Sequence, residues 1–167
     1  EYKYPKDLVM RSFPILGKGD DEKISAAIEL FRAAKKPVIY SGGGTIQADA
    51  SKELTEFSKL IGCPVTNTLM GLGAFPGNDN QFVGMLGMHG TYEANMVMSE
   101  ADLIFNVGAR FDDRITNNPS KFGLAAKKIH IDSDPSSIDK IIGVDLAIEG
   151  DAKLVMQQLI EQVKASG

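Results

Sequence analysis

The stretch that decides the fold is ADLIFNVG at residues 101–108. A short apolar run of this kind that ends in a glycine is typical of a strand buried on both faces of a parallel sheet. Two comparable runs lie before and after it in the chain, PVIYSGGG at 37–44 and KIHIDSD at 128–134. We therefore expect three buried parallel strands, with 101–107 at the centre of the sheet.

Segments with helical patterns separate these runs. Apolar residues fall on one helix face from Ile24 to Phe31, after the candidate N-caps Asp20 and Asp21. Further helices are predicted at 50–61, 92–100 and 152–163. Weaker apolar runs predict shorter strands at 63–68 and 144–148, whereas the glycine-rich segment 73–91 is predicted to be loop.

The alternation of strands and helices predicts an α/β fold, with a parallel sheet covered by helices on both faces. The length of 167 residues lies within the roughly 100–200 of one domain. Residues 1–19, interrupted by prolines and glycines, are predicted to be a lead-in from an upstream domain, and residues 20–167 to form the domain itself.

The composition is that of a globular domain and excludes several classes of protein. Apolar residues make up 43% and charged residues 24%, which excludes an intrinsically disordered chain. A net charge of −4 without a basic block argues against nucleic-acid binding. One cysteine and two histidines are too few for a disulfide framework or a thiolate or histidine-rich metal site. No run reaches the ~20 apolar residues that span a bilayer, and no signal peptide is recognisable, so we expect a cytoplasmic protein without membrane contact.

The segments that follow the strands share a chemistry suited to a nucleotide. Ligands of open α/β sheets bind beyond the carboxyl ends of the strands. Glycines at 42–44 let backbone N–H groups approach a phosphate, the planar fork of Arg110 can bind two pyrophosphate oxygens, and Asp132 suits a ribose diol. Segments 68–71 and 150–152 follow other strands. We infer a nucleotide or dinucleotide site, although the G-x-G-x-x-G fingerprint is absent.

Each of these segments also has a purely structural interpretation. The three glycines are consistent with a tight turn, and Thr68-Leu69-Met70 with a strand end that packs apolar side chains. The string GARFDDRI at 108–115 is either a solvated loop with surface ion pairs or a site where one guanidinium faces an anion and the other an anionic substrate.

Several isolated residues are open to the same two interpretations. His89, in a glycine-rich loop, is either a surface residue or a functional one. His130, within a predicted strand, is interpreted as a hydrogen-bonded core histidine, and Cys63 as an inert buried thiol. The methionines of the middle segment are expected to fill the core: Met85, Met88, Met96 and Met98.

Five strings together resemble the large, catalytic subunit of acetohydroxyacid synthase, also called acetolactate synthase, a thiamine-diphosphate enzyme. They are PVIYSGGG (37–44), TLMGLGAFP (68–76), MLGMHGTYEAN (85–95), ADLIFNVGARFDDR (101–114) and HIDSDPSSIDK (130–140). The combination of LGMHG with GARFDDR is specific within the thiamine-diphosphate enzymes. The resemblance covers the central domain of that family and neither flanking domain.

The resemblance implies a three-layer, Rossmann-like domain with a six-stranded parallel sheet, helices on both faces and a structural FAD. It implies cofactor contacts at the strand ends, from Gly42, Gly43, Gly44, Thr68, Leu69, Met70, Leu86, Gly87, Met88, His89, Gly108, Ala109, Arg110, Asp112, Asp132, Ser133, Asp151 and Ala152. It implies that Arg114 binds the carboxylate of the second ketoacid, with Met88 and Asp113 at the substrate entry. It implies no catalytic residue and no metal ligand in this segment.

The same resemblance implies the activity of the parent enzyme. That enzyme decarboxylates pyruvate and joins the two-carbon unit to pyruvate or 2-ketobutyrate, the first committed step toward valine, leucine and isoleucine. Flanking pyrimidine- and pyrophosphate-binding domains of the same chain hold its thiamine diphosphate and Mg²⁺, so the segment alone is expected to be inactive. The other implied partners are further catalytic subunits in a homo-oligomer and a regulatory small subunit, in the bacterial cytoplasm or in an organelle of a eukaryote.

Two other interpretations stay open at this point. Pyruvate oxidase, glyoxylate carboligase and oxalyl-CoA decarboxylase share the expected fold but differ in flavin use or bind ADP. A stand-alone nucleotide-binding module without an enzyme attached is the second alternative. The strings LGMHG and GARFDDR favour acetohydroxyacid synthase, because that family gives the position of Arg114 a specific role.

Overall fold

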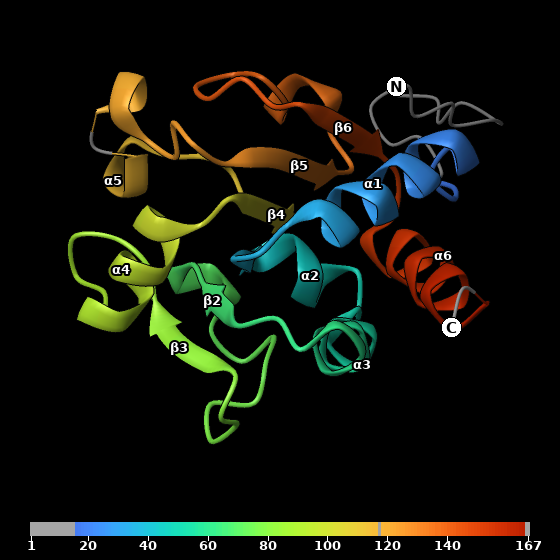
Figure 1. Cartoon of the computed structure of the whole chain (residues 1–167), viewed down its shortest axis with the longest axis horizontal. Helices are drawn as coiled ribbons and strands as arrows, with labels where there is room; N and C mark the ends of the chain where they lie inside the picture. Colours follow the sequence, from blue (N-terminus) through green and yellow to red (C-terminus); the bar gives the residue numbers. More distant parts are fainter. Residues whose placement is uncertain (1–15, 117, 166–167) are drawn as a thin grey trace, which may run out of the picture.

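A computed structural model describes residues 16–116 and 118–165. Its six strands form one parallel sheet in the order β3-β2-β1-β4-β5-β6, which confirms the predicted α/β fold (Figure 1). The strands are β1 (Pro37–Ser41), β2 (Val65–Asn67), β3 (Phe82–Met85), β4 (Leu103–Val107), β5 (Lys127–Asp132) and β6 (Leu146–Glu149). The stretch at 101–108 supplies β4, which pairs with β1 on one side and β5 on the other.

The four predicted helices are confirmed, and capping residues mark several of their ends. The Asp20 side chain accepts hydrogen bonds from the N–H groups of Glu22 and Lys23, and Gly62 ends its helix in a left-handed conformation with φ of 66°. The helices are α1 (Asp21–Ala33), α2 (Gly43–Gln47), α3 (Ser51–Ile61), α4 (Tyr92–Glu100), α5 (Asp113–Thr116) and α6 (Ala152–Ala165). Short 3₁₀ turns are η1 (Leu69–Gly71), η2 (Pro119–Lys121) and η3 (Pro135–Ser137).

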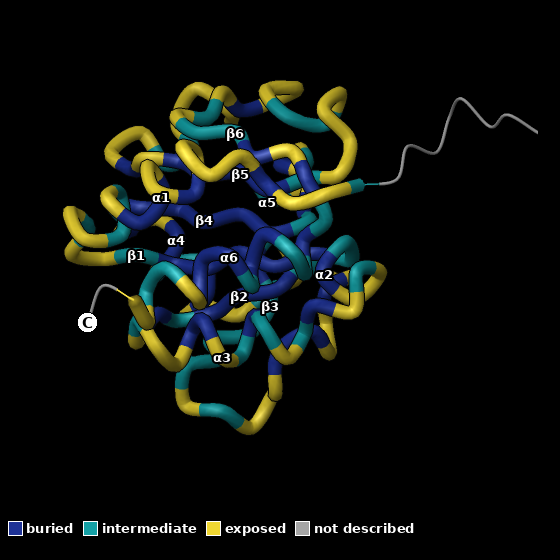
Figure 2. The backbone as a smooth tube through the Cα atoms, turned by 90° about the vertical axis from the view of Figure 1, so that its right-hand side faces the viewer, coloured by how far each residue is buried: buried dark blue, intermediate teal, exposed yellow. Residues whose placement is uncertain are grey.

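The sheet separates two apolar cores. Side chains alternate along β4, so that Leu103 and Phe105 belong to one core and Ile104 to the other. Helices α1, α3 and α6 cover the first face, while α4 and the segments after β4 and β5 cover the second (Figure 1). The inner strands β1, β2, β4 and β5 lie mostly buried between these two outer layers, whereas the edge strands β3 and β6 are partly exposed (Figure 2).

The structure corrects the prediction of loop at 73–91, because β3 lies within that segment. This strand is short, at the edge of the sheet and only half-buried, and it contains Gly84 with φ of 96°. Its apolar residues are few and interrupted by Gly84, and Gly77, Gly87 and Gly90 lie close by, so the turn signals of the segment outweighed its strand pattern.

Two other predictions also differ from the structure. Met98 is buried, but Met88 is 77% exposed and Met96 is 37% exposed, so the expectation that these methionines fill the core is wrong for both. The glycines at 42–44 form more than a turn, since α2 begins at Gly43. Most of the predicted lead-in lies outside the described residues.

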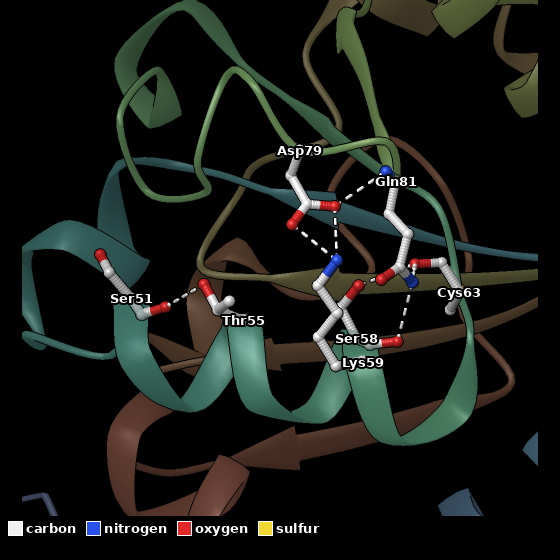
Figure 3. Close-up of polar contacts among 7 residues, drawn as sticks. All are labelled: Ser51, Thr55, Ser58, Lys59, Cys63, Asp79 and Gln81. Carbon is white, nitrogen blue, oxygen red and sulfur yellow. Dashed lines mark hydrogen bonds and ion pairs between the residues drawn. The ribbon is translucent and has the colours of Figure 1, made fainter.

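The loop between β2 and β3 is fastened to the end of α3 by polar contacts (Figure 3). The side-chain amide of Gln81 donates to the carbonyl oxygens of Ser58 and Cys63, both at 2.9 Å. Lys59 and Asp79 form an ion pair at 2.6 Å across the same gap. These contacts hold the edge of the sheet against α3 and enclose the segment that carries Cys63.

Cys63 is expected to be unreactive in the folded protein. Its side chain is buried, and burial raises the pKa of the thiol from 9.0 to about 12. At pH 8, the thiol reagent DTNB should modify the chain unfolded in guanidinium to completion and leave the native chain unmodified over the same time. Rapid stoichiometric reaction of the native chain would contradict this burial.

The same shift has a consequence for stability at alkaline pH. Because the folded thiol has the higher pKa, the unfolded thiol loses its proton first. Each rise in pH above about 9 therefore lowers the free energy of the unfolded state relative to the folded state. The free energy of unfolding is therefore expected to fall by up to ~1.4 kcal/mol per pH unit from this group alone. Cys63→Ala should flatten that slope in urea titrations at pH 8 to 10.5.

Candidate functional site

The ligand-binding edge is defined by the topology of the sheet. From β1 the chain proceeds through β2 and β3 toward one edge, and from β4 through β5 and β6 toward the other. The order therefore reverses between β1 and β4, which lie side by side. In open α/β sheets the crevice at the carboxyl ends of such a strand pair is the usual ligand site. Segments 42–44 and 108–110 follow these two strands.

Two of the three glycines after β1 bring these two segments into contact. A Cβ on Gly42 would lie 2.3 Å from the carbonyl oxygen of Gly108. A Cβ on Gly44 would lie 2.8 Å from the Cα of Gly108. The Gly44 N–H donates to the Gly108 oxygen at 2.9 Å. Gly108 itself has φ of 58°. These glycines are therefore required by backbone packing, a reason that neither sequence interpretation had considered.

Gly43 is in a different environment from its two neighbours. A Cβ there would meet Met70 alone, with the nearest atom, the Met70 Cβ, at 3.2 Å. Met70 and Leu69 lie in η1 and are 75% and 69% exposed, so this strand end does not pack apolar side chains into the core. Thr68 instead caps η1, with its hydroxyl accepting from the Gly71 N–H at 2.9 Å. Gly43 and η1 form an open rim beside the β1 end.

A pocket of about 510 Å³ lies between the β3–α4 loop and α5. Three residues that the resemblance assigns to substrate line it together: Met88, Asp113 and Arg114. Gly87 also lines it, whereas Leu86 is buried in the core and His89 is exposed on the loop. Asn95 and Ile115 complete the lining and were not among the sequence candidates.

A second pocket, of about 170 Å³, lies between the segment after β4 and the segment after β5. Arg110, Phe111 and Asp112 form one wall. The opposite wall contains residues that were not predicted: Ser137, Lys140, Ile141 and Ile142. Arg110 and Arg114 are four residues apart and line different pockets. This separation fits the hypothesis of one guanidinium for an anion and the other for a substrate.

Both guanidinium groups are available to a ligand. Among the described residues neither Arg110 nor Arg114 forms a side-chain hydrogen bond or a close ion pair. Contact with the Asp113 carboxyl and the Arg114 backbone N–H lowers the pKa of Asp112, and the two guanidinium charges lower it further. Asp112 is thus an anion at neutral pH, although its carboxylate forms no ion pair with Arg110 or Arg114. Surface ion pairs, the structural alternative for GARFDDRI, are absent from this described segment.

The remaining candidates lie after β5 and β6. Asp132 is half-buried at the end of β5, and one of its oxygens accepts from the Asp134 N–H at 2.8 Å. Ser133 beside it is exposed. Asp151 caps α6 by accepting from the Leu154 N–H at 3.1 Å, and Ala152 is buried in the core. Asp132 is therefore the best-placed acceptor of this group, while Asp151 is already committed to the helix.

His130 is buried as predicted but is not hydrogen-bonded as predicted. Neither ring nitrogen has a hydrogen-bond partner among the described residues. Its neighbour on β4, Asn106, uses its side-chain amide on both the N–H and the carbonyl oxygen of Ala109. The closest polar group is the Asp132 carboxylate, 3.5 Å from Nε2.

Two absences concern the described part of the chain alone. None of its groups of His, Cys, Asp or Glu side chains is arranged to hold a metal ion. No helix in residues 16–116 and 118–165 has the length and apolarity needed to cross a membrane.

The fold and the strand-end site agree with a family assignment from the sequence. Residues 24–159 match the model of the thiamine pyrophosphate enzyme central domain. The chain belongs to this family of central domains. It is 51% identical over 161 residues to the acetolactate synthase large subunit of Buchnera aphidicola subsp. Schizaphis graminum, and 49% identical over 160 residues to the acetolactate synthase isozyme 3 large subunit of Escherichia coli. The resemblance described above is thereby confirmed.

The match covers nearly all of this chain but a minor part of its relatives. The two alignments include 96% of the chain and 28% of each relative. A probable acetolactate synthase large subunit of Methanococcus aeolicus is 44% identical over 145 residues, which are 87% of the chain and 24% of that protein. The chain thus spans about a quarter of the length of these curated relatives.

Proposed function

We propose that the chain is the FAD-binding central domain of an acetolactate synthase. The intact enzyme would decarboxylate pyruvate and join the two-carbon unit to pyruvate or 2-ketobutyrate, in the biosynthesis of branched-chain amino acids. The observation that carries the proposal is the pairing of two unoccupied guanidinium groups, each in its own pocket, at the carboxyl edge of the sheet. One suits a dinucleotide phosphate and the other a ketoacid carboxylate.

The residues at this edge fit a dinucleotide. Arg110 would hold pyrophosphate oxygens, and the oxygen of Asp132 that does not accept from Asp134 would accept from a ribose hydroxyl. Gly43 and Met70 would provide an open apolar rim for a flat ring system. The other proposed contacts are Gly42, Gly44, Thr68, Leu69, Leu86, Gly87, Met88, His89, Gly108, Ala109, Asp112, Ser133, Asp151 and Ala152. FAD would supply a flavin here, and the condensation itself needs no net redox change.

The pocket between the β3–α4 loop and α5 would hold the second ketoacid. Arg114 would bind its carboxylate, because the guanidinium is a planar charged donor that is not paired within the described residues. Met88 would contact the alkyl tail, and Asp113 would lie at the entry. A charged group at one end and an apolar wall at the other suit a short ketoacid and discriminate between tails of different length.

Thiamine diphosphate and Mg²⁺ are proposed to bind to other parts of the protein, in its pyrimidine- and pyrophosphate-binding domains. The small share of each relative that this chain spans supports that proposal. The relatives are named as large subunits, so a regulatory small subunit is a proposed partner, together with further catalytic subunits. A bacterial cytoplasm is the proposed location.

The test is an activity assay of the intact polypeptide that contains this segment. Acetolactate should form from pyruvate when thiamine diphosphate, Mg²⁺ and FAD are present, and it should cease when thiamine diphosphate is removed. Formation of peroxide and acetyl phosphate in place of acetolactate would assign the chain to the pyruvate oxidase type instead. The absence of any product from pyruvate would contradict the proposal.

A further inference from the structure

One side chain makes three hydrogen bonds within the loop between β3 and α4, in addition to the backbone bonds of Leu86 to Asn67 and of Thr91 to Met85. The side-chain amide nitrogen of Asn95, in the first turn of α4, donates to the carbonyl oxygens of Gly87 at 3.1 Å and Thr91 at 2.8 Å. Its amide oxygen accepts from the Gly87 N–H at 3.3 Å. Asn95 therefore hydrogen-bonds both the N–H and the carbonyl oxygen of Gly87, eight residues earlier in the chain. We call this pair of bonds the Asn95–Gly87 grip.

Gly87 is also the point where this loop meets α5. It has φ of 109°, which side chains rarely tolerate. A Cβ there would lie 3.1 Å from the Ile115 Cγ2 and 3.3 Å from the carbonyl oxygen of Arg114. The Gly90 N–H donates to the Gly87 oxygen at 2.9 Å, so the position of Gly87 also sets the turn that follows it. Any movement of Gly87 would change the gap between the loop and α5.

Asn95 contributes to the pocket through the loop rather than by binding a ligand. It lines the pocket with Met88 and Arg114. However, an amide nitrogen has two hydrogens, and both are donated to the backbone of the loop. A ligand in the pocket would thus find no free donor on Asn95.

We propose that Asn95 is a positioning residue that fixes the Gly87 turn, and with it the separation of Met88 from Arg114. This separation selects the length of the apolar tail on a small carboxylate bound by Arg114. The selection between ketoacid tails rests on the proposed function, whereas the Asn95–Gly87 grip does not.

Hydrogen exchange of the 167-residue chain tests the grip directly. In Asn95→Ala, the amides of Gly87 and Gly90 should exchange roughly tenfold faster or more, because three hydrogen bonds are lost. Asn95→Asp keeps the acceptor for the Gly87 N–H and loses both donors, so its exchange should be intermediate. Glu93→Ala, an exposed position on the same helix, is the matched control and should exchange at the unaltered rate. Unchanged exchange in Asn95→Ala would overturn the proposal.

Competition between ketoacids in the intact enzyme tests the selection. Asn95→Ala, assayed at saturating FAD, should shift the ratio of kcat/KM for 2-ketobutyrate over pyruvate by about fivefold or more. Asn95→Asp should shift it less. A ratio within twofold of the unaltered enzyme, in a variant whose loop exchanges faster, would refute the selection. An unaltered enzyme that forms no acetohydroxy acid would refute the proposed function. Hydrogen exchange would then still test whether Asn95 fixes the Gly87 turn.

Discussion

Replacing Arg114 by lysine is expected to lower kcat/KM for the second ketoacid by roughly 10- to 100-fold, the scale of a lost charge-assisted hydrogen bond. Lysine keeps the positive charge but cannot present two parallel N–H donors to one carboxylate. The loss should appear in the carboligation step with both pyruvate and 2-ketobutyrate as acceptors. Initial rates of acetolactate and acetohydroxybutyrate formation in the intact enzyme measure it.

Arg110→Lys provides the matched control for this prediction. The two arginines lie in the same short segment but line different pockets. Arg114→Lys should therefore leave FAD bound and impair ketoacid use, whereas Arg110→Lys should weaken FAD retention first. Equal losses of flavin in the two variants, or unchanged ketoacid kinetics in Arg114→Lys, would show that these roles are wrongly assigned.

Gly42→Ala is expected to destabilise the fold by ~2–3 kcal/mol, a typical cost of overpacking that must move backbone. The added Cβ would overlap the Gly108 oxygen at 2.3 Å and the Ala109 Cα at 2.6 Å, and neither atom belongs to a flexible side-chain end. For a domain of this size, the melting temperature should fall by about 4–12 °C. Thermal unfolding followed by circular dichroism measures the shift.

Gly43→Ala, one residue along, separates this packing effect from ligand binding. Its Cβ would approach Met70 alone, at 3.2 Å, so the melting temperature should change by less than ~3 °C, equivalent to about 1 kcal/mol. Gly43→Val should keep the fold and lower the affinity for FAD, because the larger side chain fills the open rim. Equal melting temperatures of Gly42→Ala and Gly43→Ala would contradict the packing account, and full flavin retention in Gly43→Val would remove Gly43 from the site.

The central part of the fold was predictable because its strands are buried on both faces. Such strands carry continuous apolar runs, and β4 is recognisable from seven residues alone. The edge strand β3 was not predictable from its pattern, since half of its surroundings are solvent and a glycine interrupts it. Met88 and Met96 were misplaced for a related reason: methionine is apolar by composition, and only tertiary structure reveals that these two are exposed.

The place of the candidate residues at the strand ends was predictable where one residue type has one chemistry, and their binding roles stay predictions. Arginine directly after a buried strand points to an anion, and both arginines lie in pockets. Asn95 was missed because its contact with Gly87 joins residues eight positions apart, which no local pattern encodes. Lys140 was missed because the segment after β5 returns to face Arg110 only in the folded chain. The glycines at 42 and 44 were singled out as phosphate contacts, which stays a prediction, whereas the structure shows that they pack against Gly108.

The central claim is that the carboxyl edge of this sheet binds FAD, and a fluorescence titration tests it most directly. The chain contains no tryptophan, so protein emission interferes little with the flavin signal. The account predicts saturable quenching or anisotropy of FAD that ADP displaces weakly and NAD does not, with affinity lowered roughly tenfold or more in Arg110→Ala. Absence of saturable FAD binding in both this chain and the intact polypeptide, or equal displacement by NAD, would contradict it.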